Sequence, residues 1–319
     1  MNVNDYLATV EQLSYARPSR LIDGPGAGQR IIDICNGVGL HCTVTPDRGL
    51  NIVECTFKGI PMVFRTRGGH RKPTGDFLHD WAAGLFTTCG LHNIGVPSLD
   101  EPLHGRISQL AAEKVNIFRN DAGGIVVTGS IQEGGCLFRK TLVLDRVMTF
   151  DCGRSRIEVC DTVTNCGSEA DDAAILYHCN FGYPFISPDF EFDLPEHKVE
   201  PRDEEAASGL ADWMHLHEPV AGYREQCFRH FLPAGPDGMA VMKGMNRKLG
   251  VGLKISYDTS TLPLIVQWKN CAKNAYVLGL EPTNGSLMGR EKDLREKRLA
   301  HLEPGETVKF RFSIEFFEC

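Results

Sequence analysis

The chain has 319 residues, of which 42% are hydrophobic and 24% are charged, with a formal net charge of -7 and a sequence pI near 5.9. This composition is ordinary for a soluble globular protein, and the acidic balance argues against a nucleic-acid-binding surface, which needs a concentrated basic face. The length would allow two domains of about 150 residues, but all-β folds often run larger as one unit.

Hydrophobic periodicity predicts the class of the fold. In residues 1–29, Asn4 or Asp5 can cap a short helix that carries Leu7, Val10 and Leu13 at helical spacing. From residue 30 onward the helical period gives way to short strand-like runs separated by turn residues. The expected strands are 31–35, 40–44, 50–57, 60–64, 115–119, 125–132, 136–144, 148–150, 156–164, 174–181, 240–243, 251–257, 264–268, 276–280 and 307–317. Strands without interleaved helices predict an all-β protein, a large antiparallel β-sandwich. We expect a single domain over residues 1–319, with an N-terminal helix or extension at 1–29 and the sandwich at 30–319.

Two stretches interrupt the strands. Residues 65–93 are rich in Gly, His and Arg and contain Trp81, so we expect an ordered loop over a site. Residues 195–222 are acidic and contain proline, and they are interpreted as a solvated surface segment.

Twelve cysteines lie mostly in hydrophobic runs, and no Cys-x-x-Cys pair is present. In a chain of this length they are expected to be small buried residues with free thiols. The first 20 residues contain no apolar signal segment, and no apolar run approaches the roughly 18 residues that span a bilayer. We therefore expect a cytoplasmic protein without a membrane partner.

Polar side chains occur at alternate positions of several expected strands. His178 and Asn180 share one strand face, because successive side chains in a strand point to opposite sides. His104 and Arg106 are expected to share another, with Gly105 between them leaving room for a ligand or another backbone. Taken singly, each histidine is better explained as a hydrogen-bonded core residue.

Two further segments add to this set. Gln267 and Lys269 are expected together on one strand face, and Glu281 ends the apolar run 277–280. A carboxylate there costs desolvation free energy unless it is hydrogen-bonded or opens into a cleft, although an exposed strand-end acid is the simpler explanation. Together the groups are mixed in charge and suit hydroxyl groups, which favours a sugar ligand.

Motifs for other chemistries are missing from the sequence. It contains no Gly-x-Gly-x-x-Gly, no P-loop lysine and no Gly-x-Ser-x-Gly elbow, which weakens nucleotide-binding and serine-hydrolase interpretations. We expect no cofactor and no metal.

The sequence resembles the aldose 1-epimerase superfamily, whose fold is the galactose mutarotase-like β-supersandwich. It is most similar to an uncharacterised bacterial branch, often labelled aldose 1-epimerase family protein. The resemblance spans about residues 30–316 and rests on a set of segments in the family's order. These segments are 47–52 (DRGLNI), 84–91 (GLFTTCGL), 104–106 (HGR), 178–184 (HCNFGYP) and 280–284 (LEPTN).

The resemblance implies an isomerase that interconverts the anomers of a free aldose. It implies that Glu281 is the catalytic base, His178 the catalytic acid, His104 a second sugar-contacting histidine and Arg65 a substrate-binding arginine. The chain departs from the galactose mutarotase form at Tyr177, where that form has asparagine. The form's sugar-binding aspartate also has no clear counterpart, and Asp212 and Glu218 are both candidates.

Two expectations concern charge. Asp47 and Arg48 either contact the substrate or form a buried ion pair that orients the loop. In the resting protein Glu281 is expected to be ionised and His178 protonated, because a neighbouring carboxylate raises a histidine's pKa.

Two alternatives remain open. A metal-dependent sugar isomerase could use His92, His104 and His178 as ligands, although no tight ligand spacing occurs near them. A non-catalytic sugar-binding protein could keep the same fold, although pure binding does not require both Glu281 and His178. The sequence does not specify the sugar, its anomer or the oligomeric state.

Overall fold

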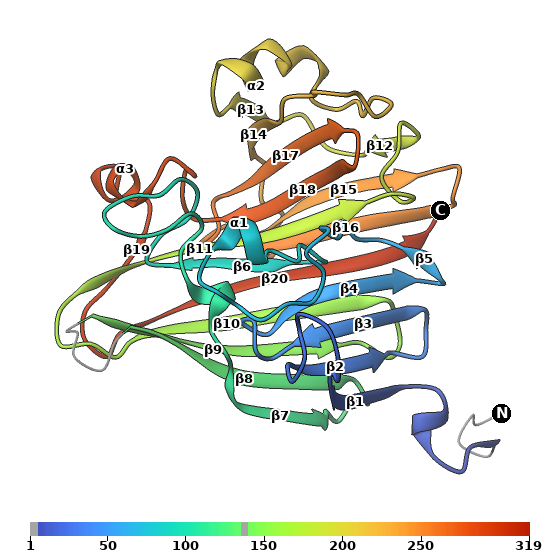
Figure 1. Cartoon of the computed structure of the whole chain (residues 1–319). Helices are drawn as coiled ribbons and strands as arrows, with labels where there is room; N and C mark the ends of the chain where they lie inside the picture. Colours follow the sequence, from blue (N-terminus) through green and yellow to red (C-terminus); the bar gives the residue numbers. More distant parts are fainter. Residues whose placement is uncertain (1–5, 135–139) are drawn as a thin grey trace.

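The computed structural model describes residues 6–134 and 140–319, which form three antiparallel sheets (Figure 1). The five-stranded sheet has the order β1 (Tyr15–Arg20), β2 (Arg30–Cys35), β3 (Leu40–Thr45), β4 (Asn51–Phe57) and β5 (Ile60–Pro61). The eight-stranded sheet has the order β12 (Phe190–Phe192), β15 (Met239–Asn246), β16 (Val251–Asp258), β20 (Thr307–Glu318), β10 (Arg156–Asn165), β9 (Thr141–Phe150), β8 (Ile125–Gly134) and β7 (Glu113–Arg119).

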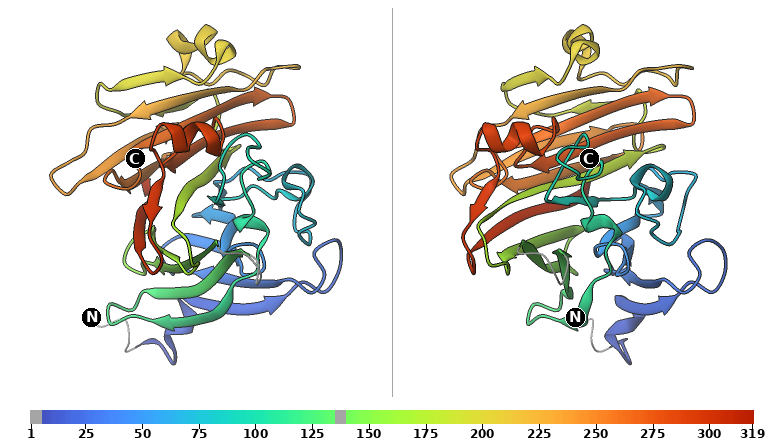
Figure 2. Two further views of the ribbon diagram at one scale, coloured as in Figure 1. Left: turned by 90° about the vertical axis from the view of Figure 1, so that its left-hand side faces the viewer. Right: turned by 60° about the vertical axis from the view of Figure 1, so that its left-hand side comes forward.

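The seven-stranded sheet carries the candidate site. Its path is β13 (Lys198–Pro201), β14 (Gln226–Phe231), β17 (Leu264–Ala272), β18 (Ala275–Thr283), β11 (Asp171–Gly182) and β19 (Ala300–Leu302), and β6 (Thr87–Leu91) also pairs with β11. The α-helices of the described residues are short: α1 (Phe77–Asp80), α2 (Glu204–Ser208) and α3 (Arg290–Arg295). Figure 2 shows α2 at one end of the molecule and β1 and β7 at the other. The all-β sandwich expected from the sequence is confirmed.

Several local expectations differ from the structure. The N-terminal helix is only a 3-10 turn, η2 (Val10–Gln12), which Thr9 caps, and a strand, β1, follows it. The expected caps Asn4 and Asp5 lie outside the described residues, as does part of the strand expected at 136–144. Residues 65–93 include α1 and β6, and the segment interpreted as solvated surface, 195–222, supplies β13 to the sheet. The single-domain division stays a prediction.

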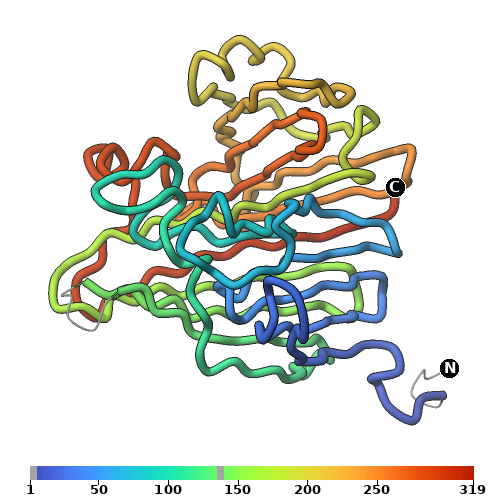
Figure 3. The backbone as a smooth tube through the Cα atoms, in the orientation of Figure 1, coloured from blue at the N-terminus to red at the C-terminus, as the bar shows by residue number. Residues whose placement is uncertain are grey.

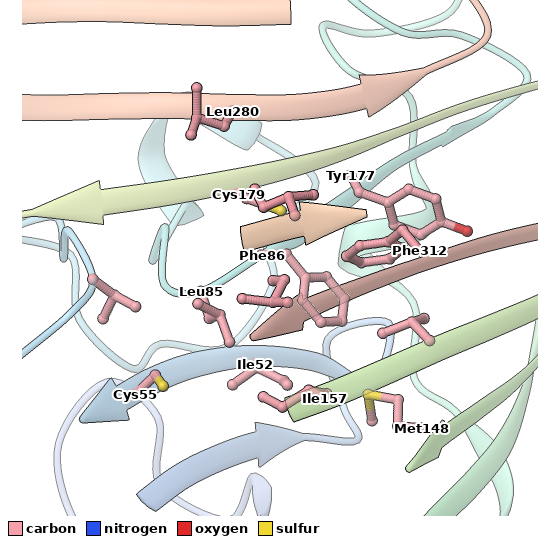
Figure 4. Packing of buried hydrophobic residues seen from close by; sticks show 14 of the residues in the cluster. Ile52, Cys55, Leu85, Phe86, Met148, Ile157, Tyr177, Cys179, Leu280 and Phe312 are labelled. Atoms are coloured by element: carbon pink, nitrogen blue, oxygen red, sulfur yellow. The ribbon is translucent and has the colours of Figure 1, made fainter. Parts of the chain in front are cut away.

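The hydrophobic core lies between the sheets. Figure 4 shows side chains from β4, β9, β10, β11, β18 and β20 packed together, with Phe86 and Tyr177 among the largest. The rings of Tyr177 and Phe312 have centroids 4.2 Å apart. The described cysteines have free thiols, and most of them are buried. No helix among the described residues is long and apolar enough to cross a membrane.

A buried ion pair connects the sheets behind the candidate site. The guanidinium group of Arg146 donates to both carboxylate oxygens of Asp161 at 2.9 and 2.6 Å, and neither side chain is exposed. Arg146 also donates to Thr88 Oγ1, and the Tyr177 hydroxyl donates to Asp161 at 2.8 Å. Arg146 explains why β9 is one continuous strand where the sequence predicted two: its polar side chain fills a buried position of the alternating pattern. The pair therefore fixes β11 and β6 against the eight-stranded sheet.

Replacing Arg146 with methionine should lower the free energy of unfolding by about 3–5 kcal/mol, because Asp161 is left as an unpaired buried charge. Urea denaturation measures this change. The double variant Arg146→Met/Asp161→Leu should recover much of the loss, and the exposed control Arg154→Met should change stability by less than about 1 kcal/mol. Equal losses in the single and double variants would contradict the proposed cause.

Candidate active site

His178 and Glu281 face each other across neighbouring strands. The β11–β18 register pairs Leu176 with Thr283 and Cys179 with Leu280, which places His178 opposite Glu281. His178 Nδ1 lies 3.1 Å from Glu281 Oε1, and the side chains are only 7% and 2% exposed. Two residues about 100 positions apart in the chain thus form one pair, because cross-strand neighbours share a sheet face.

A glycine makes room for the carboxyl group. Gly279 lies two residues before Glu281 on the same strand face, and a Cβ atom at this position would stand 2.5 Å from Glu281 Oε1 and 2.9 Å from Trp268 Cβ. Any larger residue would displace the acid or the indole ring. Glycine is unfavourable inside a strand, and at position 279 it is explained by the room that Glu281 needs.

Aromatic rings surround the pair. The rings of Trp81 and Trp268 have centroids 4.9 and 5.4 Å from that of His178, and they lie 5.7 Å from each other. Trp81 follows α1, which Figure 1 shows beside β6 and β11. Its indole Nε1 donates to Thr87 Oγ1 at 3.0 Å, and Thr87 is the β6 partner of His178. The loop expected over a site therefore delivers one wall of it.

His104 and Asn180 complete the immediate surroundings of His178. The His104 ring lies 5.4 Å from that of His178, and its Nδ1 accepts a hydrogen bond from Gly95 N at 3.3 Å. Asn180 Nδ2 donates to the carbonyl oxygen of His178 at 2.6 Å. The side-chain amide oxygen of Asn180, Oδ1, is buried without a hydrogen-bond partner in the described residues. These groups leave unused hydrogen-bonding capacity beside the pair.

Burial changes the expected ionisation of the pair. It lowers the pKa of His178 well below its usual value, and the neighbouring His104 adds to the effect. Burial also raises the pKa of Glu281 well above its usual value, with a further contribution from Glu225. The expected ionised Glu281 and charged His178 are therefore wrong for the unliganded protein, because desolvation favours the neutral form of each group. The neutral pair still holds one proton, now on the carboxyl group.

Two charged residues near the pair were missed from the sequence. Glu225 accepts a hydrogen bond from Trp268 Nε1 at 2.8 Å, and Arg202 lies 3.5 Å from Glu225. Burial and the charge of Arg202 lower the pKa of His104 to about 4. Both residues border a hollow of about 600 Å³, lined by Arg202, Asp203, Glu204, Glu205, Arg224 and Glu225. They lie in or next to the segment interpreted as solvated surface, so only the strand pairing of β13 and β14 reveals them.

Gln267 and Lys269 lie on the other face of the sheet. Val266 pairs with Glu281, so the alternate residues Gln267 and Lys269 point to the opposite side. Gln267 bonds with His230 and with the Trp213 carbonyl, and Lys269 donates to the Asp212 carbonyl at 2.8 Å. Gln267 and Lys269 therefore share a strand face, as expected, but that face points away from the His178–Glu281 pair.

Arg106 and Arg65 also have other partners. His104 has a φ of 60° and lies in a turn, so the expected strand face shared by His104 and Arg106 is wrong. Arg106 is exposed and pairs with Glu101. Gly105 does permit a close approach, by the backbone of Gly90. Arg65 forms an ion pair with Glu54 at 2.5 Å.

Asp47 and Arg48 do not pair with each other. Asp47 accepts hydrogen bonds from the backbone and the guanidinium group of Arg30, both at 2.7 Å. The buried Arg48 donates to the Arg71 carbonyl at 3.0 Å and lies near Asp80. The alternative of an ion pair between them is therefore wrong, but Arg48 does hold the loop that carries Trp81.

The remaining candidates lie apart from the pair. Asp212 bonds with His215, His217 and the buried Lys269, on the opposite sheet face, and Glu218 is exposed. His92 lies between Glu133 and Asp171, and although burial opposes its charge, hydrogen bonds to both carboxylates raise its pKa to about 9. The partners of His92 are thus two carboxylates, and His104 and His178 are not among them. Within residues 6–134 and 140–319, no group of three His, Cys, Asp or Glu residues is placed to hold a metal ion.

Comparisons with solved structures agree on the fold. A protein from Klebsiella pneumoniae subsp. pneumoniae, provisionally named an aldose 1-epimerase, superposes with a TM-score of 0.87 at 23% identity, covering 95% of this chain and 83% of that one. A galactose mutarotase-like protein from Clostridium acetobutylicum gives 0.68 at 14% identity, covering 97% and 100%. The galactose 1-epimerase from Lactobacillus acidophilus NCFM gives 0.65 at 11% identity, covering 96% and 99%. The resemblance seen in the sequence is confirmed at the level of the fold.

A family described as a domain of unknown function (DUF4432) matches residues 26–316. No curated protein matches the chain.

Replacing Glu281 with glutamine should raise the melting temperature by an amount that grows with pH above about 4.5, the usual pKa of this group. Below that pH the carboxyl group is protonated in both states. Above it the unfolded chain releases the proton while the folded chain retains it, so the wild type loses stability and the amide does not. Thermal denaturation at pH 5, 7 and 8 measures the difference. The exposed control Glu291→Gln should show no such trend, and a pH-independent difference for Glu281→Gln would contradict the raised pKa.

Proposed function

We propose that this chain, which belongs to the DUF4432 family, binds a free aldose and interconverts its anomers by acid–base opening and closing of the sugar ring. The observation that carries the proposal is the His178–Glu281 contact of 3.1 Å, buried beside two neighbouring tryptophans. A buried acid and imidazole lower the stability of the fold, and strongly perturbed ionisable groups cluster at functional sites, so this pair is a functional-site candidate.

The surroundings suit a pyranose. Trp81 and Trp268 offer flat apolar faces for the C–H surfaces of a sugar ring. Arg202, Glu225 and His104 offer charged and neutral hydrogen-bonding groups for its hydroxyls. Glu225, which bonds to Trp268, replaces Asp212 and Glu218 as the proposed sugar-binding carboxylate of the second half of the chain.

The proposed reaction moves two protons. In the neutral pair Glu281 carries the proton, and its transfer to His178 gives the carboxylate–imidazolium form. Glu281 then removes the proton of the anomeric hydroxyl while His178 donates its proton to the ring oxygen. The bond between C1 and the ring oxygen breaks and an aldehyde forms. Rotation about C1–C2 and the reverse transfers close the ring on the other face, and each positioned transfer contributes roughly 10²–10⁴-fold.

The solved structures support this choice of reaction. One neighbour is named a galactose 1-epimerase, another is provisionally named an aldose 1-epimerase, and a third is named galactose mutarotase-like. The identities of 11–23% relate the folds, so the assignment of the reaction to this chain rests on the site. Free thiols throughout the described core support the further proposal of a reducing, cytoplasmic location.

Glu281→Gln should abolish anomer interconversion while leaving sugar binding nearly unchanged, because the amide keeps the shape of the side chain but cannot accept the anomeric proton. One-dimensional exchange NMR of anomeric protons, run on a panel of neutral, deoxy and acid sugars, measures the rate and identifies the sugar. The matched control is Glu101→Gln, which removes a carboxylate outside the site. Wild-type exchange in Glu281→Gln would remove this residue from the mechanism, and a wild type that binds but does not exchange would favour a non-catalytic sugar-binding protein.

The pH dependence of kcat/KM should be bell-shaped, with a plateau around neutral pH. At low pH both members of the pair are protonated and no base remains. At high pH both are deprotonated and no acid remains. The lowered pKa of His178 and the raised pKa of Glu281 move these limits apart, so the one-proton state spans a wide range. Polarimetry from pH 4 to 10 tests this profile. Activity that follows a single ionisation would contradict a shared-proton pair.

A further inference from the structure

A chain of hydrogen-bonding side chains lies on the face of the seven-stranded sheet that points away from the candidate active site. It begins at the Pro195 carbonyl oxygen, which lies 2.7 Å from His197 Nδ1. His197 Nε2 lies 2.9 Å from His230 Nδ1, and His230 Nε2 lies 3.0 Å from Gln267 Oε1. Gln267 Nε2 donates to the Trp213 carbonyl oxygen at 2.9 Å. The chain is anchored on two fully buried side chains, His230 of β14 and Gln267 of β17.

The two ends of this chain fix where its hydrogens are. A backbone carbonyl oxygen accepts hydrogen bonds and cannot donate them. His197 Nδ1 must therefore donate to Pro195, and Gln267 must turn its NH₂ group toward Trp213. The amide oxygen of Gln267 then faces His230 Nε2, which must donate to it. Each imidazole has now used the single hydrogen that its neutral form carries.

The contact between the two rings needs a third hydrogen. Without it, the lone pairs of His197 Nε2 and His230 Nδ1 would face each other at 2.9 Å. With it, one ring is an imidazolium that donates from both nitrogens. The charge belongs on His197, which is half-buried, because burial is the largest cause that lowers the pKa of His230, to about 3.

The charged groups on the surrounding elements have partners of their own. They are Glu200 with Lys198 and Arg229, and Asp212 with Lys269, His215 and His217. Glu196, next to His197 in the sequence, is exposed. Within residues 6–134 and 140–319, neither His197 nor His230 forms an ion pair with a carboxylate, and the Trp213 ring packs against both imidazoles with centroid distances of 5.7 and 4.7 Å. The third hydrogen is therefore held by the two rings themselves.

The chain holds two points of one segment. His197 lies near the start of the segment 195–222 and Trp213 lies later in it, and Figure 3 shows the backbone between them in yellow at the top of the molecule. Helix α2 and Arg202 lie between these two points. The segment that was interpreted as solvated surface is thus attached twice to the buried side chains of β14 and β17.

We propose that the His197–His230 pair is a proton-dependent clasp. While the contact between the rings carries its hydrogen, the clasp fastens the segment 195–222 to β14 and β17. When rising pH removes this hydrogen, two lone pairs face each other, the rings separate and the segment is released. Arg202 belongs to this segment and borders the hollow beside the candidate active site, so release loosens that border. The inference stands independently of the proposed epimerase function.

Nitrogen-15 NMR of the histidine rings in the full-length protein counts the hydrogens directly. At pH 5.5 we expect both ring nitrogens of His197 to carry hydrogen, and only Nε2 of His230 to do so. Raising the pH to 9 should remove one hydrogen from His197 and leave His230 unchanged. Two neutral rings at pH 5.5 would overturn the proposal, because the contact between them would then not depend on a proton.

Hydrogen exchange of the backbone amides of residues 198–213 tests the release. The glutamine of His197→Gln places its amide nitrogen near the position of His197 Nε2, so it can donate to His230 without a charge, whereas His197→Asn is too short. At pH 5.5 the wild type and His197→Gln should exchange at the same rate, and His197→Asn faster. At pH 9 the wild type should exchange about tenfold or more faster than His197→Gln, because it has lost a charge-assisted hydrogen bond. The exposed control His79→Gln should follow the wild type at both pH values.

Two exchange results would contradict the clasp. One is equal exchange of the wild type and His197→Gln at pH 9, and the other is full protection of His197→Asn at pH 5.5. Each comparison is made at a single pH, so the intrinsic pH dependence of exchange cancels. If a variant does not fold, the wild-type NMR spectra still decide the hydrogen count. None of these measurements uses anomer exchange, so their failure leaves the epimerase proposal untouched.

Discussion

The register between β11 and β18 is the constraint on which the candidate site depends. It places His178 opposite Glu281, and a slip of one residue would turn one of the two side chains to the other face. The opposite face of β11 resists such a slip, because the Tyr177 hydroxyl is bonded to the buried Asp161, which Arg146 holds in turn. The Arg146–Asp161 ion pair and the His178–Glu281 pair therefore lie against opposite faces of β11.

Burial gives the site its chemistry at the expense of stability. Water is largely excluded from His178 and Glu281, so each group avoids its charged form and the carboxyl group keeps its proton. A carboxylate formed in such surroundings is a stronger base than a solvated one. Gly279 and the indole ring of Trp268 maintain this enclosure, and Glu225 and Arg202 set its electrostatics. A site of this kind fits neutral, hydroxyl-bearing ligands better than anions that bring their own charge.

Much of this could be predicted from the sequence. Turn residues and alternating strands indicated the sandwich, and polar residues in apolar strands indicated His178 and Glu281. Alternation also placed Gln267 and Lys269 on a common face, but it cannot say which face that is relative to another strand. The pairing of Val266 with Glu281 decides the face. It assigns Trp268, which lies between Gln267 and Lys269 in the sequence, to the face of the candidate site. Arg202 and Glu225 are not part of a periodic pattern in the sequence. The turn at His104 depends on a positive φ, which cannot be predicted from a histidine in the sequence.

The central claim is that His178 and Glu281 form an enclosed pair in which both groups are neutral and the carboxyl group carries its proton. Nitrogen-15 shifts of the His178 imidazole and the carbon-13 shift of the Glu281 carboxyl group, followed from pH 4 to 10, test it most directly. The account predicts a neutral imidazole and a protonated carboxyl group at pH 7. A carboxyl group that titrates near 4.5 beside a histidine that titrates near 6.5 would show two independent, solvated groups and would contradict it.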